Sequence, residues 1–383
     1  MRRNLADKMM PTVAIFCGDA LSTACPAIRL VRPLEKSGWK LRSGAEYFRN
    51  VIDVDLNAAN GADAIVIQRN FPSQNTYASL RYLAATGIPL IYDIDDAFLD
   101  IPENHLGYTH YDSLRPYIKW MLTQADLITA STNYLAESLR KYTSRRIAVQ
   151  PNLVDWQLFD AHPRGQEHIC HILVAGTQSH REDWKLIETP ILQILANQTA
   201  AVRFIFLGDV PERLKNNPRV ESLPFESNYK SYAKVLQTLP VQLALIPLVD
   251  TPFNRAKSNI KWLEYSAAGI PGIYSDVEPY NNCVRSGIDG ILVNNSVEAW
   301  THAISSLMYD SVQRLSLINE ARTRVSTQHS IDAGLSNYID IFANQIGRPH
   351  KKQFAGEIDI FSLHVGRRAL RILDQRLLWR LRR

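Results

Sequence analysis

Short, continuously apolar segments recur along this chain, and a longer segment with helical spacing follows most of them. In the first 158 residues the apolar segments are 13–17, 64–68, 90–92, 127–130 and 147–149. Between residues 169 and 346 they are 171–175, 203–207, 243–246, 272–274 and 290–293. Strands that alternate with helices form a parallel sheet with both faces covered, so each strand is apolar on both sides. The sequence therefore predicts two doubly wound, Rossmann-like α/β domains in tandem.

The alternation is interrupted once, by the polar stretch 159–168, which we interpret as a linker between domains 1–158 and 169–346. We expect residues 331–346 to form a helix that closes the second domain. Residues 347–383 form a separate tail. Open parallel sheets bind ligands at the carboxyl ends of their strands, so a cleft between the two domains is the expected site.

Composition is that of a soluble globular protein. Hydrophobic residues make up 46% of the chain and charged residues 21%, which is ordinary for a folded protein. No apolar run reaches the roughly 18 residues that a membrane-spanning helix needs. The four cysteines have no metal-binding spacing and predict reduced thiols in a cytoplasmic protein.

The segment that begins at Lys257 has the features of an anion-binding helix start. Ser258 and Asn259 are good N-cap residues, and the first N–H groups of a helix carry partial positive charge. Glu264 follows about two turns into the same helix, where its carboxylate can accept from a sugar hydroxyl. The alternative is a surface helix in which Glu264 pairs with Lys261.

A second candidate for anion binding is the loop after the first strand of the second domain. Its residues include Gly176, Thr177, His180, Arg181 and Lys185. Glycine lets the backbone approach a ligand closely, arginine binds phosphate with two hydrogen bonds, and lysine supplies a point charge. The alternative is a solvated helix start capped by Asp183.

Three carboxylates, Asp93, Asp95 and Asp96, follow the apolar segment 90–92 of the first domain. Carboxylates in a cleft are costly unless they are paired or solvated. Asp95 or Asp96 is therefore a candidate catalytic base for an acceptor hydroxyl. The alternative is that one aspartate caps the next segment and another pairs with Arg69 or Arg29, which are our candidates for acceptor-side contacts.

The two-domain layout and these motifs resemble family 4-like glycosyltransferases of the GT-B fold, whose bacterial members build lipopolysaccharide, O-antigen or capsule glycans. The resemblance covers most of residues 12–345. It includes the segments Ile28–Leu30, Ala62–Arg69, Tyr92–Asp96, Ala125–Ser131 and Pro151–Asp155. It implies a nucleotide-diphosphate sugar held by the second domain, an acceptor glycan held by the first, and hexosyl transfer with retained anomeric configuration.

The resemblance also suggests roles for individual residues. Arg181 and Lys185 match the family's basic pair for the diphosphate, although the family's spacing is one residue wider, so His180 is an alternative for the first member. Glu264 matches the second Glu of the Glu-x7-Glu motif, which binds the ribose. The first Glu, which contacts the sugar, falls on Ala256. The family often has a His near Asp95.

Other functions compete with this interpretation. A non-catalytic glycan- or membrane-binding protein that keeps the fold would account for Ala256. A haloacid-dehalogenase-like phosphohydrolase also has an Asp-x-Asp motif, and residues 127–131 and 206–209 imitate its later motifs. We expect no metal and no cofactor besides the donor, because the basic residues and the helix start would neutralise the leaving diphosphate.

The positive charge of the chain lies almost entirely in its tail. Residues 364–383 hold seven arginines and one aspartate, a net of +6, whereas the whole chain carries +5. Leucines recur every three or four residues beside Trp379, so we predict a basic amphipathic helix. Such a helix suits an anionic membrane surface and a peripheral location at its inner face. Docking on a protein is the alternative, and nothing else in the sequence supports nucleic-acid binding.

Overall fold

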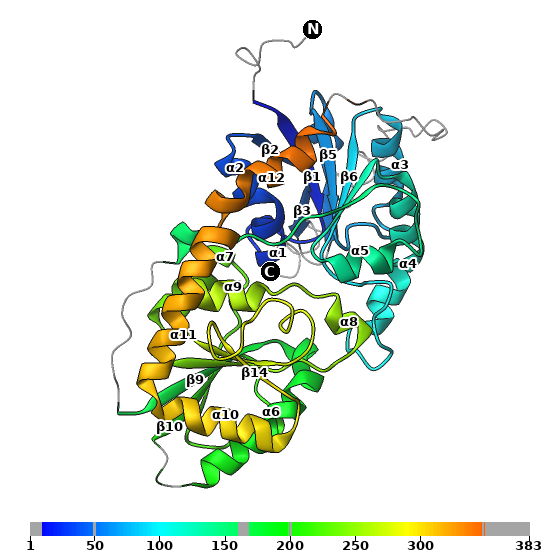
Figure 1. The fold of residues 1–383 in the computed structure, drawn as a ribbon. Coiled ribbons are helices and arrows are strands. Elements are labelled where there is room, and N and C mark those ends of the chain that lie inside the picture. The colour runs from blue at the N-terminus through cyan, green and yellow to red at the C-terminus, as the bar shows by residue number, and fades with distance from the viewer. Residues whose placement is uncertain are drawn as a thin grey trace, which may run out of the picture.

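Two six-stranded parallel sheets form the framework of the protein (Figure 1). The computed structural model describes residues 10–48, 51–159, 168–197, 199, 201–346 and 348. The first sheet has the order β2-β1-β5-β6-β7-β8, with bounds Lys40–Ser43, Thr12–Cys17, Ala64–Gln68, Leu90–Ile94, Leu127–Ala130 and Ile147–Val149. The second has the order β11-β10-β9-β12-β13-β14, with bounds Val220–Leu223, Val202–Gly208, Cys170–Gly176, Leu243–Ile246, Gly272–Ser275 and Ile291–Val293. These sheets confirm the predicted α/β class with two Rossmann-like sheets.

Helices connect the strands within each half. Those of the first half are α1 (Ala24–Pro26), continued by a π-helical turn (Ala27–Val31) into α2 (Arg32–Lys36), then α3 (Tyr77–Ala85), α4 (Tyr108–Gln124) and α5 (Asn133–Leu139). The second half has α6 (Arg181–Ala196), α7 (Tyr229–Thr238), α8 (Pro252–Arg255), α9 (Ile260–Ala267), α10 (Val297–Tyr309) and α11 (Ser311–Arg324). A last helix, α12, spans Ile331–Ala343.

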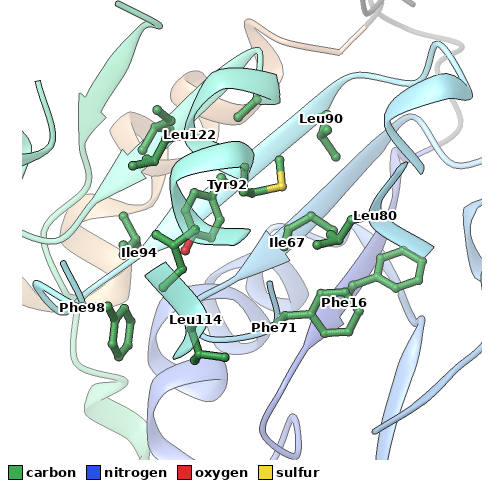
Figure 2. Packing of buried hydrophobic residues seen from close by; sticks show 14 of the residues in the cluster. Phe16, Ile67, Phe71, Leu80, Leu90, Tyr92, Ile94, Phe98, Leu114 and Leu122 are labelled. Carbon is green, nitrogen blue, oxygen red and sulfur yellow. The ribbon is translucent and has the colours of Figure 1, made fainter. Parts of the chain in front are cut away.

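Each sheet is buried on both faces, which explains the continuously apolar segments. Ala14 and Phe16 of β1 belong to one hydrophobic core, whereas Val13 and Ile15 belong to another on the opposite face. Figure 2 shows part of the first of these cores, where Phe16 packs beside Phe71. Residues of β9 and β10 also alternate between two cores. Both faces need apolar side chains, so no polar alternation marks these strands.

The strands that the sequence pattern did not indicate lie at sheet edges or outside the sheets. β2 and β11 each pair with a single neighbour, and their side chains are mostly exposed or half-buried. β3 (Ala45–Phe48) and β4 (Val51–Val54) form a two-stranded sheet of their own, which packs on the core of the first domain. A strand at an edge needs no continuous apolar run, so these segments carried no clear signal.

The last helix does not close the second domain as expected, because α12 packs on the first. Its residues Ile331, Tyr338 and Phe342 join the core that contains Val13 and Leu30. The Tyr338 hydroxyl donates to the carbonyl of Arg29. Figure 1 shows α12 beside α2, beyond the long α11 that runs along the second domain. The apolar stripe of α12 therefore covers the first sheet, which the sequence pattern could not specify.

The two domains meet through the loops at the carboxyl ends of their strands. The Thr132 hydroxyl donates to the carbonyl of Ala256 over 2.9 Å. The Tyr229 N–H donates to the carbonyl of Ser22 over 2.9 Å. The haloacid-dehalogenase-like alternative is excluded by this arrangement, because residues 93–96 lie at the carboxyl end of β6 in one sheet and residues 206–209 at the carboxyl end of β10 in the other.

Two predicted segments cannot be compared with the structure. Residues 160–167 of the predicted linker and residues 364–383 of the basic tail lie outside the described residues. In the part of the chain that is described, no helix is both long and apolar enough to cross a membrane.

Candidate active site

The first domain places an arginine in an unusual backbone conformation at the carboxyl end of β5. Arg69 has a φ of +50°, in the left-handed region that residues other than glycine seldom adopt. Its N–H donates to the Asp93 carbonyl over 2.8 Å, and its carbonyl accepts from the Tyr92 hydroxyl over 2.8 Å. Strand β6 therefore holds this conformation in place. Backbone strain of this kind is concentrated at functional positions.

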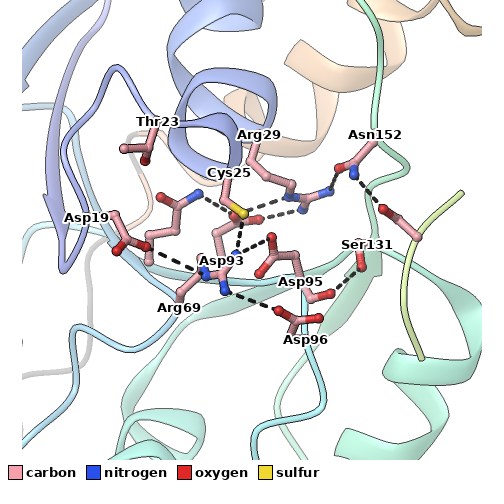
Figure 3. Close-up of polar contacts among 12 residues, drawn as sticks. Asp19, Thr23, Cys25, Arg29, Arg69, Asp93, Asp95, Asp96, Ser131 and Asn152 are labelled. Atoms are coloured by element: carbon pink, nitrogen blue, oxygen red, sulfur yellow. Dashed lines mark hydrogen bonds and ion pairs between the residues drawn. The ribbon is translucent and has the colours of Figure 1, made fainter. Parts of the chain in front are cut away.

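The three predicted carboxylates have different partners (Figure 3). Asp93 is 1% exposed and pairs with Arg29 over 2.5 Å. Asp95 and Asp96 instead accept from Arg69 over 3.0 Å and 3.1 Å. Their side chains are 10% and 26% exposed. We call Arg69, Asp95 and Asp96 the acidic edge.

Arg29, expected on the acceptor side, presents almost no surface to a ligand because it is only 2% exposed. Besides its ion pair with Asp93, its guanidinium donates to the Gln150 carbonyl and to the Asn152 side-chain oxygen. A charge at this depth is tolerated only when it is paired and hydrogen-bonded. The chain uses Arg29 to neutralise Asp93 beneath the acidic edge.

Asp95 combines a raised pKa with a carboxylate oxygen that has no hydrogen-bond partner among the described residues. Burial raises its pKa to about 6, although the neighbouring Arg69 acts in the opposite direction. One carboxylate oxygen, Oδ2, accepts from Arg69, while Oδ1 is buried and has no hydrogen-bond partner among the described residues. A carboxylate with a free oxygen and a pKa near neutrality is suited to accept a proton.

In the second domain, the backbone at the ends of β9 and β10 is closely packed. Gly208 has a φ of +115°, and a Cβ at this position would lie 2.1 Å from the carbonyl oxygen of Gly176. Only glycine therefore fits at the end of β10. Beyond Gly176, the hydroxyls of Thr177 and Ser179 lie 2.9 Å apart, and a 3-10 turn (Gln178–His180) leads into α6.

Asp183 connects this loop to the segment before α8. It is 3% exposed, and its carboxylate accepts from the Val249 N–H over 2.8 Å and from the Asn254 amide over 3.1 Å. The ring of His180 contacts its other oxygen over 3.0 Å. Sequence reasoning treated Asp183 only as a solvated cap, because an acidic residue in a first helical turn looks the same in either role.

Two lysines one helical turn apart bring positive charge to the start of α9. The Lys261 ammonium donates to the Ala175 carbonyl over 2.8 Å, which places it against the end of β9. Burial and the charge of Lys257 lower the pKa of Lys261 to about 8. The charge of Lys261, followed by burial, lowers the pKa of His180 to about 4, so the ring is neutral at pH 7.

Arg181 lies at the cleft, whereas Lys185 does not. Arg181 lines a pocket between the domains, together with Pro102, Asn104, His105, Leu106, Gln178, Ser179, Glu182, Asp183, Val249, Thr251, Phe253 and Asn254. Lys185 is 57% exposed and bonds to Glu182 over 2.7 Å on the surface of α6. Lys261 is the cation that sequence reasoning missed, and its spacing of four residues from Lys257 was the available signal. We call Arg181, Lys257 and Lys261 the cationic edge.

Glu264 lies in a buried environment rather than in a surface ion pair. It is 4% exposed, and the Tyr232 hydroxyl donates to its Oε2 over 3.4 Å. Burial raises its pKa to about 8, so the carboxyl group of the ligand-free protein is mostly protonated at pH 7. The Lys261 ammonium, its partner in the alternative interpretation, bonds to Ala175 instead.

The residues just before α9 do not cap it with their side chains as expected. Asn259 occupies the N-cap position, but its side chain makes no capping hydrogen bond. The Ser258 hydroxyl accepts from the Asn152 amide of the first domain over 2.8 Å. The start of α9 is therefore tied to the first domain.

Comparisons with known proteins agree with this architecture. Residues 163–310 match the family model of glycosyl transferases group 1. Sucrose-phosphate synthase from Thermosynechococcus elongatus has a similar structure, with a TM-score of 0.63 at 12% identity over 87% of this chain and 98% of that one. HepE from Anabaena, in complex with UDP and glucose, has a TM-score of 0.60 at 14% identity over 87% of this chain and 99% of that one. The starch synthase IV catalytic domain from Arabidopsis thaliana, bound to ADP and acarbose, has a TM-score of 0.61 at 11% identity over 89% of this chain and 100% of that one.

This chain has the GT-B fold. The predicted resemblance to GT-B glycosyltransferases is thereby confirmed for the architecture, and for residues 163–310 by the family model as well. The matched residues contain the whole cationic edge but none of the acidic edge. No curated protein matches the sequence.

The GT-B motif position that falls on Ala256 contributes no side chain to the cleft. Ala256 is fully buried and packs with Phe253 in the hydrophobic core of the first domain. Its carbonyl accepts the cross-domain hydrogen bond from Thr132. This position therefore joins the two domains.

Proposed function

We propose that this GT-B protein transfers a sugar from a nucleoside-diphosphate sugar to a hydroxyl group of a glycan acceptor. The observation that supports it best is the crowding of positive charge in the cationic edge. Lys257 and Lys261 lie close enough for each to disfavour a second positive charge nearby, as the lowered pKa values of Lys261 and His180 indicate. A diphosphate would relieve this repulsion.

The cleft supplies groups for each part of the reaction. Lys257, Lys261 and Arg181 would bind the diphosphate and stabilise its charge as it leaves. Glu264 would accept from a ribose hydroxyl, as the family resemblance implies. Asp95 would take the proton of the acceptor hydroxyl.

We extend the proposal to transfer without a metal ion and with retention at the anomeric carbon. The cationic edge and the start of α9 carry the charge that a metal would otherwise supply. Retention rests on the family resemblance. The coupling constant of the anomeric proton in the product, measured by NMR, tests retention, and activity in the presence of a chelator tests the metal.

The acceptor we propose is a lipid-linked or cell-surface glycan, reached from the cytoplasmic face of a membrane. Support comes from the arginine-rich tail at residues 364–383, where each basic residue contributes about 1 kcal/mol on an anionic surface. Full-length protein should sediment with liposomes that contain anionic lipid, and a variant truncated after residue 350 should remain in the supernatant. Equal sedimentation of the two proteins would contradict the membrane contact.

A second candidate function is favoured by Ala256. A protein that keeps the fold without activity would bind a nucleotide or glycan and transfer nothing. Calorimetry with UDP, ADP and GDP, followed by an assay for release of nucleoside diphosphate from the corresponding sugars, separates the two. The enzyme binds and releases, and Asp95→Asn binds without transferring. A chain that binds but releases nothing is the non-catalytic protein, and one that binds no nucleotide contradicts the transferase proposal.

A further inference from the structure

Asn152 lies between a buried arginine of the first domain and a serine of the second. The Arg29 guanidinium donates to its Oδ1 over 3.1 Å, and its Nδ2 donates to the Ser258 hydroxyl oxygen over 2.8 Å. Asn152 is 7% exposed, so both bonds are sheltered from water. Figure 3 shows Asn152 with Arg29 on one side and Asp93 beyond it.

The chemistry of arginine determines which way this amide points. A guanidinium has donors only, so the oxygen of Asn152 must face Arg29 and the NH2 group must face Ser258. Arg29 is itself held by two hydrogen bonds to Asp93, 2.5 Å and 3.3 Å long. The Arg29–Asp93 ion pair therefore fixes the orientation of Asn152, and Asp93 lies two residues before Asp95.

This orientation leaves the Ser258 proton available. The hydroxyl oxygen of Ser258 already accepts from Asn152, so its O–H must donate in another direction. Within the described residues it has no acceptor. Ser258 is half-buried and directly follows Lys257 of the cationic edge. A hydroxyl donor beside a lysine suits an anion.

We infer that Arg29, Asn152 and Ser258 form a relay that keeps the Ser258 hydroxyl oriented as a donor to the diphosphate. The inference rests on the proposed function, because it assumes that a diphosphate binds at the cationic edge. Ser258 is then a binding residue and Asn152 a positioning residue. The relay also links the two halves of the site, since its ends are the Arg29–Asp93 ion pair and the start of α9.

Calorimetry with paired ligands tests the relay. UDP, ADP and GDP are compared with uridine, adenosine and guanosine, which lack the phosphates. Ser258→Ala should weaken binding of the preferred diphosphate about tenfold and leave that of its nucleoside unchanged, because only a phosphate accepts from this hydroxyl. Ser258→Thr, which keeps the hydroxyl, should restore the affinity.

Asn152→Asp tests the orientation itself. The carboxylate of this variant still accepts from Arg29. Towards Ser258 it presents an acceptor oxygen in place of an N–H donor, so the Ser258 hydroxyl would donate to it and not to the diphosphate. Diphosphate affinity should fall by at least the same factor, with nucleoside affinity unchanged. Thr132→Val removes another cross-domain side-chain bond, to Ala256, and should change neither affinity.

The outcomes separate the relay from the proposed function. Wild-type affinity for diphosphate in Ser258→Ala overturns the relay alone. An equal loss of diphosphate and nucleoside affinity also overturns it, since that pattern means a general structural role. A wild-type protein that binds none of the three diphosphates overturns the proposed function and the relay together.

Discussion

The charged clusters of the two domains treat buried charge in opposite ways. In the first domain each arginine lies with carboxylates, Arg29 with Asp93 and Arg69 with Asp95 and Asp96. In the second, positive charges act on their neighbours: Lys257 lowers the pKa of Lys261, and Lys261 lowers the pKa of His180.

The difference separates charge that holds the fold from charge that awaits a ligand. A buried ion pair with full hydrogen bonding is satisfied within the protein, and removing one partner leaves an expensive isolated charge. Crowded like charges are unfavourable until an anion arrives. The first domain therefore should respond to charge removal mainly in stability, and the second mainly in binding.

The largest expected effect is that of Arg29→Met on stability. It leaves Asp93 buried without its cation, which costs about 3–5 kcal/mol in the free energy of unfolding. Arg69→Met is the matched variant, and its loss should be smaller because Asp96 is 26% exposed and Asp95 can take up a proton. Urea unfolding followed by circular dichroism measures both. Equal losses would show that the two arginines play the same role.

The second expected effect is on ligand affinity. Lys261→Met removes a charged donor from the cationic edge and should weaken binding of nucleoside diphosphate about 10–30-fold, in line with hydrogen bonds to charged groups. Lys185→Met is the control, because that lysine is 57% exposed and pairs with Glu182. Calorimetry at pH 7, where Lys261 is protonated, measures both. If Lys185→Met has the larger effect, the pair predicted from sequence is the correct one.

The fold was largely predictable because burial on both faces leaves a clear record in the sequence. The central strands of both sheets appear as continuously apolar segments, with ends within a residue or two of those observed. Edge strands such as β2 pair on one side only and have no such record. The position of α12 was not predictable either, since an apolar stripe does not say which sheet it covers.

The sequence predicted which segments contribute to the candidate site, but not which residues pair with one another within it. The acids after β6 and the basic residues before α9 stand at strand and helix ends, where chemistry gathers. Which aspartate takes which arginine depends on contacts such as Arg29 with Asp93, 64 residues apart. The sequence pointed to Lys185, whereas the structure points to Lys261 as the second cation of the cleft. The reason is similar, because tertiary packing determines which side of α6 faces solvent.

The smallest expected effect is a change of rate with pH, and it concerns Asp95. Its pKa of about 6 means that the carboxylate needed as a base is progressively lost below pH 6. The rate of sugar transfer at saturating substrate should fall about tenfold per pH unit there, because one proton inactivates the base. In Asp95→Asn this dependence should disappear, together with most of the activity.

Protonation of Asp95 should increase the stability of the protein, although it lowers the rate of transfer. The native pKa of Asp95 lies above the value of about 3.9 expected for an unfolded chain, so the native state binds the proton more tightly. The contribution of this group to stability therefore falls as the pH rises from about 4 to about 6, and it is regained on acidification. Comparing the pH dependence of the melting temperature of wild type with that of Asp95→Asn isolates this contribution. If the rate loss below pH 6 instead follows a loss of structure, the decline is unfolding, and Asp95 is a paired carboxylate like Asp93.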